Sequence, residues 1–98
     1  MSFNKYLDDF YLGQVLDDYE ESFLKDIDEE NFIKVYEVFK KYNFYFIQDI
    51  ILAYLELFTI DSKIVEQGIL KLREDLGENF VYLIGNKISY LETIYKEI

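Results

Sequence analysis

The sequence predicts an all-α fold, a small bundle of five or six helices. Apolar and aromatic side chains recur at spacings of three and four residues along most of the chain, the period of a helix buried on one face. No stretch alternates between apolar and polar residues as a strand does, and no Asn-Gly or Asp-Gly hairpin turn occurs. Four pairs at i,i+4 in the helix-stabilising order support this: Glu21–Lys25, Glu30–Lys34, Glu37–Lys41 and Glu92–Lys96. With 98 residues, we expect a single domain, 1–98.

Two short helices are expected in the N-terminal third. The first, over 3–12, places five apolar side chains on one face: Phe3, Tyr6, Leu7, Phe10 and Tyr11. Gly13 is expected to end it. The run from Asp17 to Glu20 is similar to an acidic capping box, which predicts a second helix over about 18–26.

A third helix is expected to begin after Asp28, whose carboxylate can cap it. Glu29 and Glu30 in its first turn suit the positive end of the helix dipole. Its apolar side chains form two stripes, which indicates neighbours on two sides: Phe32, Tyr36 and Phe39, and Val35, Val38 and Tyr42. Asn43 tolerates a left-handed backbone and is expected to end the helix.

Residues 44–58 are the most hydrophobic stretch, with twelve apolar or aromatic residues among fifteen. We interpret them as one central helix that packs on several sides. Its polar residues Gln48, Asp49 and Glu56 share one sector. A carboxylate pair such as Asp49 and Glu56 can support acid–base chemistry, but a narrow stripe facing solvent is the preferred interpretation.

Two further helices are expected toward the C-terminus. Asp61 can cap a helix over 62–76, Gly77 stands at the expected C-terminal cap position, and a last helix covers about 79–97. At an offset of 34 residues, apolar positions between 35 and 54 match those between 69 and 88. This similarity predicts two antiparallel helical hairpins, 29–58 and 62–97, stacked side by side with HEAT-like packing.

The absence of cysteine and histidine excludes several chemistries. Without thiols no disulfide, thiolate metal site or cysteine nucleophile can form, and without imidazole there is no serine triad or histidine zinc site. We therefore expect a non-catalytic protein without a cofactor. The start of the chain has no secretory signal, and the carboxylates within 44–60 disfavour a membrane span. A cytoplasmic location without membrane contact is expected.

Acidic residues concentrate in the first 30 positions. That segment holds ten carboxylates against Lys5 and Lys25, a net charge of −8 within a total of −10. Such a field disfavours direct nucleic-acid binding and favours a protein partner with a basic surface. The candidate partner-binding residues are Asp17, Asp18, Glu20, Glu21, Asp26, Asp28, Glu29 and Glu30.

Small inhibitors, immunity proteins and antitoxins often use acidic surfaces of this kind, and spaced carboxylates can imitate a row of phosphates. The sequence predicts a factor of this class. Two alternatives stay open. The carboxylates can simply be solvated faces and helix caps, or the chain can be a helical oligomerisation or adaptor module, a homodimer included, that uses its apolar and tyrosine-rich surface.

Residues 26–37 suggest a less favoured alternative, a calcium-binding regulator. Their carboxylates resemble those of an EF-hand loop at positions one, three, five and twelve: Asp26, Asp28, Glu30 and Glu37. Asn31 replaces the glycine of that loop and Lys34 stands at its ninth position. A capping role for Asp28 is therefore preferred.

Overall fold

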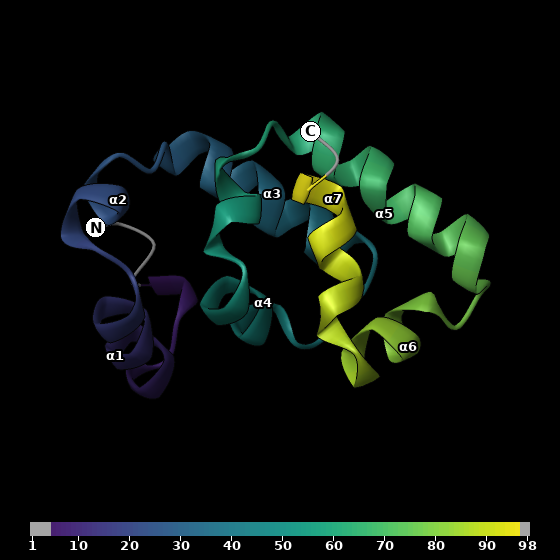
Figure 1. Ribbon diagram of the computed structural model, residues 1–98, viewed down its shortest axis with the longest axis horizontal. Coiled ribbons are helices and arrows are strands. Elements are labelled where there is room, and N and C mark those ends of the chain that lie inside the picture. The colour runs from purple at the N-terminus through teal and green to yellow at the C-terminus, as the bar shows by residue number, and fades with distance from the viewer. Residues whose placement is uncertain (1–4, 97–98) are drawn as a thin grey trace.

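Helices make up most of residues 5–96, the range that the computed structural model describes. Within that range there are seven α-helices and no β-strand, with the 3-10 helices η2 and η3 among them (Figure 1). In chain order the elements are α1 (Asp9–Asp18), α2 (Glu21–Lys25), α3 (Glu29–Lys41), α4 (Ile47–Ala53), η2 (Leu55–Thr59), α5 (Ser62–Leu76), α6 (Phe80–Asn86), η3 (Ile88–Leu91) and α7 (Glu92–Lys96). The all-α prediction is confirmed, with seven helices in place of five or six. None of them combines the length and apolarity that crossing a bilayer requires.

Local signals predicted the two long helices correctly. α5 spans the expected residues 62–76, and α3 begins directly after Asp28. The side chains of Asp28 and Asp61 each accept a backbone N–H from the first turn of the following helix, at 3.1 and 2.8 Å. Asn43 after α3 and Gly77 after α5 have positive φ angles of 64° and 86°. Each of these helix ends is therefore set by its own capping residue.

The N-terminal third differs from its predicted helices. α1 lies further along the chain than the expected 3–12, whose first residues fall outside the described range, and Gly13 stands in its interior. The capping box from Asp17 to Glu20 is wrong, because Asp17 and Asp18 end α1 and Glu20 precedes α2 without a side-chain cap. Packing of α1 against α4 outweighs the low helix propensity of glycine.

The central stretch 44–58 consists of two segments and is not the single helix predicted. α4 ends at Ala53, Tyr54 takes a non-helical backbone (φ −138°, ψ 56°), and η2 follows. A continuous α-helix would turn Leu55 and Leu57 to nearly opposite sides. The break and the tighter 3-10 winding allow Leu55, Leu57 and Phe58 all to be fully buried.

This stretch is nevertheless the centre of the molecule, as expected. α4 contacts α1 and α3, while η2 contacts α3 and α7. Aromatic rings connect these elements: Phe32 and Phe39 of α3 lie 4.9 and 5.7 Å from Phe58 of η2, measured between ring centroids. Phe44 extends the cluster to Phe39 at 5.1 Å and to Phe80 of α6 at 6.0 Å.

The last predicted helix, 79–97, is divided into α6, η3 and α7, and its final residue lies outside the described range. Gly85 and Asn86 at the end of α6 are weak helix formers. Lys87 then takes a non-helical backbone (φ −145°, ψ 80°) before η3 begins.

The two halves of the chain after residue 27 share one order of elements. Each has a long helix capped by aspartate, a residue with positive φ, a seven-residue helix, one non-helical residue and a 3-10 helix. Asp28 and Asp61 are separated by 33 residues, as are Tyr54 and Lys87. The offset at caps and breaks is thus one residue shorter than the sequence comparison indicated.

Two glycines in helix interiors predict opposite effects on stability. At Gly13 no atom lies within 4 Å of the position of an added Cβ, so Gly13→Ala should raise the free energy of unfolding by about 0.5–1 kcal/mol. At Gly68 that Cβ would lie 2.7 Å from Cγ1 of the buried Ile94. Gly68→Ala should therefore lower the free energy of unfolding by about 1–3 kcal/mol, despite its better helix propensity.

Urea denaturation of the two variants beside the wild type measures both effects. Stabilisation by both substitutions would contradict the close approach of α5 and α7 at Gly68.

Candidate protein-binding surface

The eight acidic residues predicted to bind a partner follow one another along the segment that connects α1, α2 and α3. They occupy the end of α1, both ends of α2 and the start of α3: Asp17, Asp18, Glu20, Glu21, Asp26, Asp28, Glu29 and Glu30. All eight side chains are exposed to solvent. The structure thus brings them together on one segment, which we call the acidic surface.

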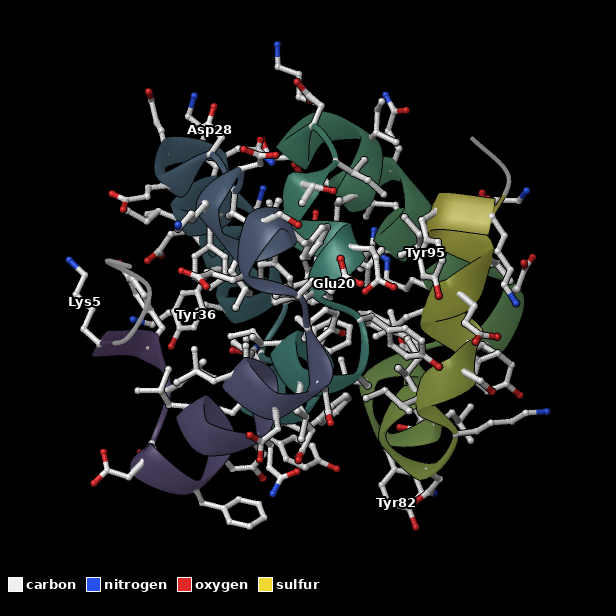
Figure 2. All side chains as sticks on the ribbon, turned by 60° about the vertical axis from the view of Figure 1, so that its left-hand side comes forward. Lys5, Glu20, Asp28, Tyr36, Tyr82 and Tyr95 are labelled. Carbon is white, nitrogen blue, oxygen red and sulfur yellow. The ribbon has the colours of Figure 1, made fainter. Side chains whose placement is uncertain are left out.

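The carboxylates of the acidic surface are spread out and do not converge on one point. In Figure 2, where the α1–α2 end is turned forward, Glu20 and Asp28 lie well apart. Two members have a lysine nearby: Lys25 Nζ is 3.1 Å from Glu21, and Lys34 Nζ is 3.6 Å from Glu30. Both pairs are exposed and contribute little to stability, so cationic groups of a partner can replace these lysines.

Residues 26–37 do not form an EF-hand loop. From Glu29 onward they belong to α3, so the carboxylate of Glu37 projects from a helix and does not close a loop. Among the described residues, no group of three or more carboxylates is placed to hold a metal ion. The geometry gives the calcium interpretation no support, and Asp28 caps α3 as preferred.

The polar stripe of the central stretch holds the N-terminal segment and is not the solvent-facing stripe predicted. Gln48 Oε1 accepts the backbone N–H of Asp8 at 2.6 Å, and Gln48 Nε2 donates to the Asp8 carboxylate at 3.2 Å. The Tyr11 hydroxyl donates to Asp49 Oδ1 at 2.7 Å. This hydrogen bond is the main cause of a raised pKa for Tyr11. Gln48 and Asp49 therefore fasten α1 and the residue before it to α4.

The hydroxyl of Tyr19 fills the break between α4 and η2. It accepts the N–H of Leu55 at 3.2 Å, and its proton lies toward the carbonyl oxygen of Leu52 (3.0 Å) and Glu56 Oε1 (3.3 Å). Its ring stacks on Phe23 of α2, with centroids 5.7 Å apart. Burial is the main cause that raises the pKa of Tyr19 to about 12. Tyr19 thus gives partners to backbone groups that the break would otherwise leave unpaired.

An apolar hollow of about 310 Å³ borders the acidic surface where α1 meets α2. It is lined by Leu16, Tyr19 and Leu24, together with Glu21 and Lys25. Leu24 is buried, whereas Leu16 is 50% exposed. Apolar groups surrounded by charged ones are the usual composition of a protein interface.

Sequence reasoning found the acidic residues and missed the groups that position them. Tyr11 and Tyr19 gave no sign of their role, because tyrosine is abundant throughout the chain. The available signal was the set of polar residues on an otherwise apolar stretch: Gln48, Asp49 and Glu56. No known protein family, no curated protein and no solved structure matches this chain.

Tyr19→Phe should lower the free energy of unfolding by about 1–3 kcal/mol, because it leaves the Leu55 N–H and the Leu52 carbonyl without their partner. Tyr36→Phe is the matched control, since no contact of the Tyr36 hydroxyl depends on its oxygen and its ring packs on Tyr6. Urea denaturation near pH 7 compares the two variants. Equal small losses would show that the Tyr19 hydroxyl does not support the break.

A second readout of Tyr19→Phe is the dependence of stability on alkaline pH. Burial disfavours the phenolate, so the pKa of Tyr19 is about 12 in the folded protein against 10.0 for a free phenol. Its contribution is fully present below about pH 10 and is lost as the pH rises through the folded value. Between these values the wild type should lose stability more steeply than Tyr19→Phe, and parallel slopes would contradict the burial of this group.

Proposed function

We propose that this chain is a non-catalytic protein-binding factor of the inhibitor, immunity or antitoxin type, which docks its acidic surface on a basic surface of a partner protein. The observation that carries the proposal is the exposure of all eight carboxylates on a segment held in place through Tyr19. A fixed array of charges loses less entropy on binding than a mobile acidic tail. Carboxylates on a rigid support can therefore occupy the sites that phosphates take on a nucleic-acid-binding partner.

The hollow lined by Leu16, Tyr19 and Leu24 supports the same proposal. Charges steer and orient a partner, whereas buried apolar contacts near the centre of an interface carry much of the affinity. Because Glu21 also lines the hollow, an apolar side chain of the partner can enter it while neighbouring cations meet the acidic surface.

We also propose that 29–58 and 62–97 are two stacked antiparallel hairpins with HEAT-like packing. The shared order of elements in the two halves supports this arrangement, as do the contacts of α3 with α5 and of η2 with α7. The contact of α1 with α4 then makes the N-terminal third a cap on the first hairpin. The acidic surface would stand at that end of the stack.

Two variants with the same change in charge test the proposal. One replaces four members of the acidic surface by their amides: Asp17, Asp18, Glu20 and Glu21. The control replaces four exposed carboxylates elsewhere: Glu37, Glu74, Asp75 and Glu78. Immobilised wild-type protein captures the partner from the native cell, and the purified partner is then titrated against all three proteins at several salt concentrations.

We expect the acidic-surface variant to bind about 10- to 100-fold more weakly, while the control binds like the wild type. Wild-type affinity should fall as salt rises, because salt screens exposed charges. Equal losses in both variants would show that only net charge matters. An affinity independent of salt would show that the acidic surface is not used, and either result would overturn the proposal.

A further inference from the structure

One row of α3 faces the next long helix of the chain. Asn31, Val35, Val38 and Tyr42 follow one another at spacings of four, three and four residues, which places them on one side of α3. At the end of this row the Tyr42 hydroxyl donates to Glu66 Oε2 of α5 at 2.6 Å. Val35 is fully buried. The row is therefore the side through which α3 meets α5.

α5 carries the equivalent row, 33 residues later, which is the offset between the caps and breaks of the two halves. The equivalent residues are Ile64, Gly68, Lys71 and Asp75. All four line an open groove of about 440 Å³ between α5 and the η3–α7 segment. No helix within residues 5–96 covers this groove, which is the place where a further unit would pack if the order of elements continued.

The groove has an apolar interior. Leu72, Leu76, Tyr90 and Ile94 line it beside the row of α5, and Ile64 is 42% exposed. The corresponding row of α3 is covered by α5, whereas the row of α5 is open. Exposed apolar surface of this kind marks an interaction site.

We propose that the groove is an interface with a second copy of this chain. The protein carries a net charge of −10, so most of its surface repels a second copy. At the groove the charges of Lys71 and Asp75 cancel. In Figure 1, α1 and α2 stand at one end of the long axis, which measures 37 Å, and α5 and α6 stand toward the other. Two copies joined through the groove keep their acidic surfaces apart.

The contact is isologous, with the same surface used by both copies. Such an interface closes at two subunits. Ile64 supplies an exposed apolar side chain, and the space between α5 and η3–α7 receives the Ile64 of the other copy. The acidic surfaces of both subunits stay accessible, so this inference does not depend on the proposed function.

The oligomeric state of the full 98-residue chain tests the proposal, measured by sedimentation velocity from about 1 μM to about 1 mM, the range of weak self-association. The wild type should change from monomer to dimer across this range. Ile64→Asp should weaken association at least ~10-fold, because it places a carboxylate in an apolar contact. Tyr82→Asp is the control, since Tyr82 is 62% exposed on α6 and outside the groove (Figure 2), and it should dimerise like the wild type.

A second variant keeps the test decisive if Ile64→Asp unfolds. Lys71→Glu leaves the apolar groove intact and makes its charge negative, so dimerisation should weaken at low salt and recover at high salt. A wild type that stays monomeric at about 1 mM would assign the groove to a different occupant and overturn the proposal. Dimerisation of Ile64→Asp with wild-type affinity, or loss of dimerisation in Tyr82→Asp, would overturn it as well.

Discussion

The hydroxyl of Tyr19 is the contact on which the arrangement of the N-terminal half depends. The break at Tyr54 turns Leu55 into the core, and it also leaves backbone groups without helical partners. Tyr19 gives a partner to the Leu55 N–H and to the Leu52 carbonyl oxygen. Its ring meanwhile stacks on α2, whose only buried residue is Leu24. One side chain therefore stabilises the bend of the central stretch and holds the acidic surface beside it.

The parts of the fold that were predictable from sequence are those determined locally. α5 was predicted at both ends because Asp61 and Gly77 are themselves the signals that start and stop it. The breaks at Tyr54 and Lys87 were not, because their causes lie elsewhere in the chain. The Leu55 N–H finds its partner 36 residues earlier, and no pattern within the central stretch reveals that partner.

The candidate site was predictable in composition and not in construction. Charge alone located the acidic surface, since carboxylates between Asp17 and Glu30 are exposed wherever the helices begin and end. The role of Gln48 and Asp49 was misread, because a polar residue on an apolar helix looks the same whether it meets water or a side chain of another segment. The groove beside Ile64 was likewise hidden, since it becomes visible only when the two halves are compared as structures.

Native-state hydrogen exchange of the backbone amides, followed by NMR at low denaturant concentrations, tests most directly whether the acidic surface is a fixed part of the fold. Elements that unfold together share one opening free energy. The amides of α1 should open with those of α4, at a free energy close to that of α3 and α5, because Tyr19, Gln48 and Asp49 join them. Rapid exchange throughout α1 and α2, while α3 and α5 stay protected, would contradict the account.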